Sequence, residues 1–74
     1  MNNKTVKEFL DITDFSDIDE VDIIEIHDGI NYEYDVVENS VKECCIRDFG
    51  DDEIVEFWIN EYEEKRILSI SIYG

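Results

Sequence analysis

Two β-rich runs near the end of the chain constrain its fold more than any other feature. Residues 54–60 and 67–73 are rich in isoleucine and aromatic residues, and a charged segment, residues 61–66, separates them. In the second run the side chains alternate between apolar and polar, as Leu68, Ser69, Ile70, Ser71, Ile72 and Tyr73. Such alternation is typical of an antiparallel strand with one buried and one wet face. The pattern therefore predicts a β-hairpin at the end of the domain.

A second hairpin is predicted in the middle of the chain. β-Branched residues are frequent over 21–27, and the run 32–37 alternates again, with Tyr32, Tyr34 and Val36 on one face and Glu33, Asp35 and Val37 on the other. Asp28-Gly29 between the runs is a preferred two-residue hairpin turn, which Ile30-Asn31 could lengthen to four residues. In the first run, residues 21–27, the pattern does not show which face is buried.

Two short helices complete the predicted fold. Thr5-Val6-Lys7-Glu8 has the pattern of a capping box, and a helix over residues 6–13 would turn Val6, Phe9 and Leu10 toward a sheet. Residues 14–20 follow as a connector. Asn39 and Ser40 offer a second cap for a helical turn or two over 41–46, which Phe49-Gly50 would end. The sequence thus predicts one α+β domain over residues 1–74, with a four-stranded, mainly antiparallel sheet of two hairpins, one N-terminal helix on its inner face and a short second helix.

The composition is that of a small folded protein. Hydrophobic residues make up 43% of the 74 residues, so we expect folding despite a net charge of −15. A chain of this length builds a thin core, in which a deep, water-excluding active site is hard to form. No apolar run approaches the ~20 residues that span a bilayer, and we see no signal-peptide pattern. Adjacent Cys44 and Cys45 cannot form a long-loop disulfide, which favours a reducing, cytoplasmic setting.

The charge is distributed very unevenly. Between Asp11 and Glu38 the chain carries eleven carboxylates and no lysine or arginine. A long stretch of one sign repels itself, so its presence suggests a basic partner outside the fold. Direct binding to nucleic acid is not expected, because the six Lys and Arg residues are scattered. The carboxylates predicted to imitate phosphates toward a basic partner are Asp14, Asp17, Asp19, Glu20, Asp22, Glu25, Asp28, Glu33, Asp35 and Glu38.

Neither catalysis nor a cofactor is predicted. The serines lack a glycine-flanked nucleophile elbow, and His27 is the single histidine. Residues 17–22 alternate oxygen ligands, but a calcium loop that starts at Asp17 would lack the glycine at its sixth position and would have Asp28 in place of the glutamate at its twelfth. A second acidic cluster, Asp48, Asp51, Asp52 and Glu53, could attract divalent cations loosely. Cys44 and Cys45 alone do not supply a zinc ligand set, so no specific metal site is predicted.

Two alternatives to partner binding through the acids stay open. The acidic face could serve only to keep a small protein soluble, or the chain could be a structural or regulatory interaction module, monomeric or a homodimer that pairs exposed sheet edges. Aromatic residues are common interface anchors, and Tyr34, Trp58, Tyr62 and Tyr73 are the candidates for partial exposure. For Tyr34 and Trp58, packing in the core is the default expectation.

In its size, its acid-rich segment 11–40, its lack of catalytic motifs and its α+β pattern, the chain resembles small acidic proteins of phages and mobile elements of low-GC bacteria. It also resembles the anti-CRISPR inhibitors that act as DNA mimics. Residues 5–10 followed by the strand and turn over 23–29 resemble the start of many short prophage proteins. The resemblance implies an inhibitor, in a bacterial host cell, that occupies a basic DNA- or RNA-binding groove of a host defence complex, with a CRISPR effector as one candidate partner.

Overall fold

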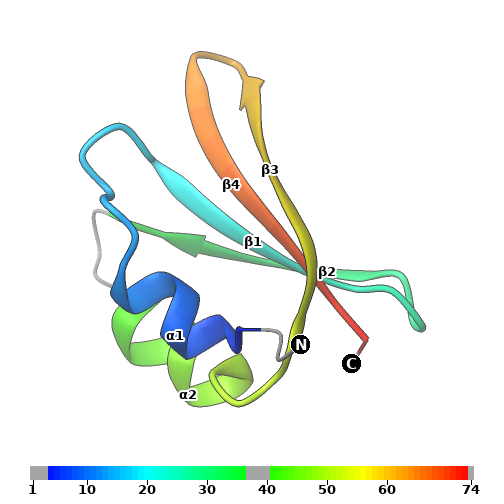
Figure 1. The fold of residues 1–74 in the computed structure, drawn as a ribbon. Helices are drawn as coiled ribbons and strands as arrows, with labels where there is room; N and C mark the ends of the chain where they lie inside the picture. Colours follow the sequence, from blue (N-terminus) through cyan, green and yellow to red (C-terminus); the bar gives the residue numbers. More distant parts are fainter. Residues whose placement is uncertain (1–3, 37–40, 74) are drawn as a thin grey trace.

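A helical layer covers one face of a four-stranded sheet in the computed structural model, which describes residues 4–36 and 41–73 (Figure 1). The elements are α1 (Val6–Asp11), β1 (Glu20–Glu25), β2 (Ile30–Asp35), the π-helical η1 (Val41–Cys45), α2 (Ile46–Phe49), β3 (Ile54–Tyr62) and β4 (Lys65–Ile72). The strands lie in the order β2-β1-β4-β3. Both predicted hairpins, β1–β2 and β3–β4, are confirmed, as are the α+β class and the two short helical segments. None of the described helices is long and apolar enough to cross a membrane.

The sheet is mixed: two of its three strand pairs are antiparallel, in line with the prediction of a mainly antiparallel sheet, and the third is parallel. Each hairpin is antiparallel, but β1 and β4 pair in parallel at the centre of the sheet. Parallel strands need a long crossover connection. The segment that contains η1 and α2 is this connection, because it joins β2 at one edge of the sheet to β3 at the other edge. Strand β3 therefore runs parallel to β2, and β4 runs parallel to β1.

Helix α1 is held by its own cap and by the segment that follows α2. The predicted capping box is present: the Glu8 amide donates to the Thr5 hydroxyl (3.2 Å), and the Thr5 amide donates to the Glu8 carboxylate (3.1 Å). The helix ends at Asp11, two residues earlier than predicted. The Thr13 hydroxyl donates to the Phe9 carbonyl (2.6 Å) and so competes with the hydrogen bonds that would continue the helix.

The core lies between the helical layer and one face of the sheet. Its centre is formed by fully buried side chains of the two middle strands, and helical residues cover them; these residues are Val21, Ile23, Leu68, Ile70 and Ile72 from the sheet and Val6, Leu10, Val41 and Cys45 from the helices. The predicted inward face of β4 is therefore confirmed. Its predicted wet face is wrong at Ser69 and Ser71, which are 2% and 3% exposed, and is confirmed only at Tyr73, just after the strand, which is 60% exposed. Both serines lie on a central strand whose neighbours cover them, and Ser69 accepts a hydrogen bond from Asn60 (3.0 Å).

The two hairpin turns differ in their chemistry. The β1–β2 turn covers residues 26–29 and closes with a bond from the Gly29 amide to the Glu25 carbonyl (2.8 Å), with Gly29 at φ +68°. In the β3–β4 hairpin the strands extend further than predicted and leave Glu63 and Glu64 as the turn, at φ +50° and +68°. Non-glycine residues rarely adopt this conformation. The second hairpin therefore has an acidic and conformationally strained tip.

The second helical segment is longer than predicted. Helical structure runs from Val41 through Phe49, first as η1 and then as α2, and Gly50 follows it. The proposed caps Asn39 and Ser40, and the last predicted strand residue Val37, lie outside the described residues. Cys45 is fully buried and packs in the core with the sheet residues.

Candidate functional site: the acidic face of the sheet

The face of the sheet opposite the helices, here called the open face, carries four carboxylates on β1 and β2. Glu20 lies opposite Asp35 and Asp22 lies opposite Glu33 in the antiparallel register. Directly opposed residues share a face, and Val21 between the two β1 acids points into the helix-covered core. The four carboxylates, here called the carboxylate quartet, therefore form a two-by-two array on the open face.

The members of the quartet differ in exposure. Glu33 and Asp35 lie on the edge strand β2 and are exposed, whereas Glu20 and Asp22 lie on the inner strand β1 and are each 8% exposed. This corrects the prediction that all of them form one solvent-facing row. On the other side of β1, Ile67 and Ser69 of β4 are the neighbours of Glu20 and Asp22 and complete their burial.

Burial and mutual repulsion change the proton affinity of the quartet. The pKa of Glu20 is raised to about 7, chiefly because its protonated carboxyl donates a hydrogen bond to Asp22, and then through burial and through the charge of Asp22. Lys65 acts in the opposite direction with a smaller effect. Asp22 Oδ1 is buried without a hydrogen-bond partner in the described part of the chain. At neutral pH the buried pair therefore holds a labile proton and a poorly satisfied oxygen.

The connector before β1 holds three further predicted acids. Asp14 accepts hydrogen bonds from the amide and the hydroxyl of Ser16, which hold its pKa below the ordinary value. Asp17 is exposed in the same connector. Asp19 accepts a bond from the Arg66 amide (2.9 Å) and therefore lies next to the start of β4. Because Glu20 follows directly, these acids continue the negative charge from one end of the quartet.

The remaining predicted acids do not join this surface. Glu25 lies on the helix-covered side of β1, near Tyr32, whose pKa is raised first by burial and then by the Glu25 carboxylate. Asp28 lies in the β1–β2 turn, at the other end of the hairpin. Glu38 lies outside the described residues. The predicted row is thus divided, and the quartet with the connector acids is the part that the fold brings together.

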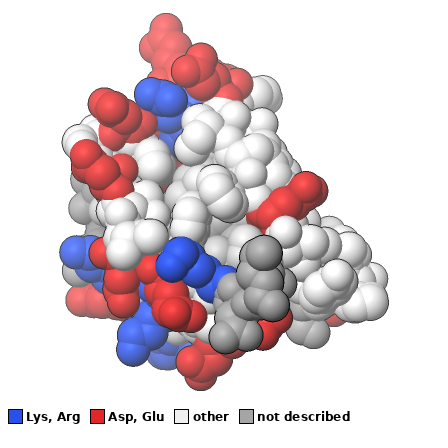
Figure 2. Space-filling view, viewed as in Figure 1, with Lys and Arg blue, Asp and Glu red and all other residues white. Residues whose placement is uncertain are grey.

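Few of these acids are neutralised within the molecule. The described residues form two ion pairs, Arg47–Asp48 (3.1 Å) and Arg66–Glu61 (3.6 Å), and neither includes a predicted partner-binding acid. Figure 2 shows the acids gathered at the β3–β4 tip and along one side, with a few separate basic residues and a broad uncharged area in the middle. The negative charge of the connector and the quartet is therefore available to an external cation or basic surface.

The sequence did not reveal that β3 is an exposed edge strand. Within the described residues no strand pairs with its outer side, where only the first residue is covered: the Ile54 amide donates to the Lys4 carbonyl (3.0 Å). Its large side chains reach solvent: Phe57 is 56% exposed, Ile59 45% and Trp58 36%. The Phe57 ring contacts Phe9 of α1 with a centroid distance of 4.6 Å. An available signal was that apolar residues occupy both faces of this run, but that pattern equally fits a buried central strand. Tyr34, in contrast, is 9% exposed and packs in the core, as expected.

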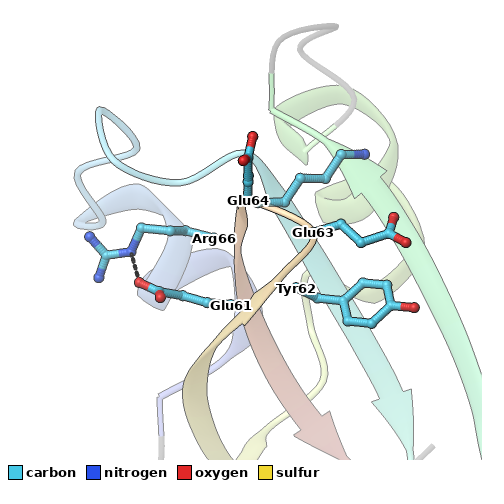
Figure 3. Close-up of a pocket in the computed structure, with 6 residues that line it drawn as sticks. Glu61, Tyr62, Glu63, Glu64 and Arg66 are labelled. Carbon is cyan, nitrogen blue, oxygen red and sulfur yellow. Dashed lines mark ion pairs between the residues drawn. The ribbon is translucent and has the colours of Figure 1, made fainter.

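The tip of the β3–β4 hairpin forms a shallow hollow rather than an enclosed pocket. Its lining consists of residues 61–66 of this one hairpin. Figure 3 shows the side chains fanning outward, with Glu61 and Arg66 paired on one side and Tyr62 and Glu63 on the other. A surface of this shape presents side chains to a partner and does not sequester a small substrate.

The thiols and the histidine are poorly placed for nucleophilic chemistry. Burial raises the pKa of Cys45 to about 12, so its thiol stays neutral at physiological pH. His27 lies in the exposed turn after β1, with its ring 5.8 Å from that of Tyr73. The described residues thus offer the open face as the main candidate site. Comparison with protein-family models, with curated protein sequences and with solved structures found no match to this chain.

Proposed function

We propose that this protein is a non-enzymatic inhibitor that binds a basic, nucleic-acid-binding surface of another protein and thereby excludes the nucleic acid. The observation that carries the proposal is the lack of internal ion pairs for the connector acids and the quartet among the described residues. Self-repulsion of this kind opposes folding. A basic partner would relieve it, and the resemblance to acidic phage proteins makes a host defence nuclease, such as a CRISPR effector, the target class to test.

The spacing of the acids supports imitation of phosphates. Alternate residues on a strand are about 6.7 Å apart, so two paired strands offer one carboxylate per about 3.4 Å along the strand direction. Each strand of duplex DNA carries one phosphate charge per about 3.4 Å of the helix axis. Glu33 and Asp35 are exposed and would contact the partner directly. Glu20 and Asp22 lie beside them on the inner strand β1, where they are buried, and would act through their field. The connector acids extend the same charge beyond the end of β1.

Charge reversal on the open face tests this proposal. In a variant with Glu33→Lys and Asp35→Lys, the contact surface changes sign while the core is untouched. A control with Glu43→Lys and Asp51→Lys changes the net charge equally, but at exposed positions in and after the helical layer. Each tagged protein is used to capture partners from a lysate of a low-GC bacterium, and the captured proteins are eluted with competing duplex DNA.

The expected result is that the wild type and the control capture the same DNA-binding protein, that added DNA releases it, and that the open-face variant does not capture it. Equal capture by all three proteins would place the contact on another surface. Partners that DNA does not release would contradict competition with nucleic acid.

A second candidate function is a homodimeric interaction module, and the exposure of β3 favours it. An unpaired apolar edge strand invites pairing with a second strand. Light scattering over a range of salt concentrations tests this candidate, because screening of self-repulsion should strengthen such a dimer. Ile59→Lys should abolish the dimer, and Ile26→Lys, at a turn residue of the same exposed fraction (45%), should not. A monomer at every salt concentration would rule this candidate out.

A further inference from the structure

Three carboxylates converge on the open face. Glu20, Asp22 and Glu33 each offer an oxygen atom, and these three atoms lie within 4.8 Å of one another. The strand register causes the convergence: Glu33 lies opposite Asp22 on β2, and Glu20 lies two residues before Asp22 on the same face of β1. Two of the three side chains are more than nine-tenths buried, so the cluster is built into the sheet and is not a chance meeting of mobile surface acids.

One oxygen of Asp22 in this cluster lacks a partner. Its Oδ1 atom is buried and receives no hydrogen bond from the described residues. Leaving such an atom unsatisfied costs on the order of 1–3 kcal/mol, and more for a charged group. Buried polar atoms in native proteins are usually satisfied by a donor, an ordered water or an ion. Neither of the two ion pairs of the described residues reaches this cluster.

We propose that Glu20, Asp22 and Glu33 form a binding site for a calcium ion. Calcium takes carboxylate oxygens at about 2.3–2.6 Å, so two oxygens bound to one ion lie at most about 5 Å apart. The observed spacing of the three oxygens satisfies this limit with little rearrangement. Magnesium binds oxygens at about 2.0–2.1 Å, demands near-ideal octahedral geometry and gives up its waters reluctantly, so we expect it to bind this flexible, partly exposed set less tightly. Glu33 is exposed, so water can complete the coordination from the solvent side.

A proton shared between Glu20 and Asp22 is the competing occupant of this cluster. The experiment is therefore done at about pH 8, because carboxylates bind metal ions only after losing their proton. Such a calcium site would exist whether or not the open face also binds a protein partner. Its test needs only the purified full chain, freed of metal with a chelator.

Two measurements report on metal binding. Isothermal titration with Ca²⁺, and separately with Mg²⁺, gives the stoichiometry and the affinity. Tb³⁺ luminescence excited through tryptophan gives the location, because Trp58 is the single tryptophan. Trp58 lies opposite Ser69, and Ser69 lies opposite Asp22, so the indole and the cluster share the open face two strands apart, about 10 Å.

The expected result is one Ca²⁺ per chain with a dissociation constant between about 10⁻⁵ and 10⁻³ M, weaker binding of Mg²⁺, and Tb³⁺ luminescence that Ca²⁺ displaces. Asp22→Asn and Glu33→Gln should each weaken Ca²⁺ binding at least about tenfold, the loss expected when one of few charged ligands is removed. Asp51→Asn, in the second acidic cluster, should leave the affinity unchanged. Glu33→Gln alters an exposed residue of an edge strand, so it serves as the test even if Asp22→Asn fails to fold.

Two results would overturn the proposal. An absence of saturable Ca²⁺ binding and of Tb³⁺ luminescence in the wild type would leave the proton as the occupant. Equal affinities in the wild type, Glu33→Gln and Asp51→Asn would mean that the ions gather in the diffuse atmosphere of a highly charged protein and do not occupy this site.

Discussion

The two hairpins of this sheet have the same architecture and opposite chemistry. The β3–β4 hairpin places Leu68, Ile70 and Ile72 in the core and leaves apolar side chains exposed along β3. The β1–β2 hairpin buries apolar residues on its covered face, but on the open face it gathers the carboxylate quartet. Grouped carboxylates oppose folding, and apolar burial favours it. The two hairpins therefore share the apolar core on the covered face and differ on the open face, where β1–β2 gathers like charges whose repulsion a ligand or partner would relieve.

The largest effect should come from the core of the β3–β4 hairpin. Ile70→Ala removes a fully buried side chain from the middle of the covered face and should lower the free energy of unfolding by about 3 kcal/mol. Ile24→Ala, at a half-buried position on the open face of β1, should cost about 1 kcal/mol. Urea denaturation of the two variants measures both. Equal losses would mean that the covered face and the open face of the sheet contribute alike to stability.

The next effect concerns pH and the acidic hairpin. The pKa of Glu20 is about 7 in the folded chain and near its ordinary value of 4.5 when unfolded, so the native state binds more protons between these values. The free energy of unfolding should therefore fall as pH rises from about 5 to about 8, by about 2 kcal/mol after allowance for screening. The lowered pKa values of Glu8 and Asp14 act in the opposite direction, but only at more acidic pH.

Glu20→Gln provides the matched control for this pH dependence. Its amide keeps the donor that the protonated carboxyl offers to Asp22 but does not titrate. The melting temperature of this variant should change much less between pH 5 and 8 than that of the wild type. A wild-type protein that becomes less stable on acidification from pH 8 to 5 would show that the carboxylates are paired inside the fold, contrary to the open face described above.

The smallest effect lies at the strained tip of the β3–β4 hairpin. Glu64 has φ +68°, a conformation that glycine adopts without steric cost, so Glu64→Gly should stabilise the protein by about 0.5–1 kcal/mol. Glu64→Gln removes the same charge and keeps the Cβ atom. If Glu64→Gln raises the melting temperature as much as Glu64→Gly does, charge repulsion and not backbone strain destabilises the tip.

Local sequence signals predicted most of the elements. The Thr5 to Glu8 capping box, the alternation over Tyr32 to Val36 and the apolar face of β4 are set by neighbouring residues, and all three were found. Strand order was not predictable in the same way. The parallel pairing of β1 with β4 depends on how the connection through η1 and α2 crosses the sheet, and no local pattern encodes that path.

The candidate site was predictable in composition but not in arrangement. An excess of acid before residue 40 is visible in the sequence, but the separation of Glu25 from Asp22 and Glu33 depends on the face that each residue occupies. The burial of Glu20 and Asp22 arises because β1 became an inner strand, with β4 on its other side. Trp58 and Ile59 were left exposed for the same reason, since placing β4 inside put β3 at the edge.

The salt dependence of partner binding tests the central claim most directly. We expect the affinity for the captured basic partner to fall steeply between about 50 and 200 mM salt. The exposed acids of the connector and of β2 would form several ion pairs with the partner, and salt weakens each of them. The Glu33→Lys and Asp35→Lys variant should bind more weakly, and its affinity should depend less on salt concentration. The Glu43→Lys and Asp51→Lys control should keep the wild-type dependence on salt. An affinity that does not change with salt would contradict the account, because binding would then not depend on the acidic face.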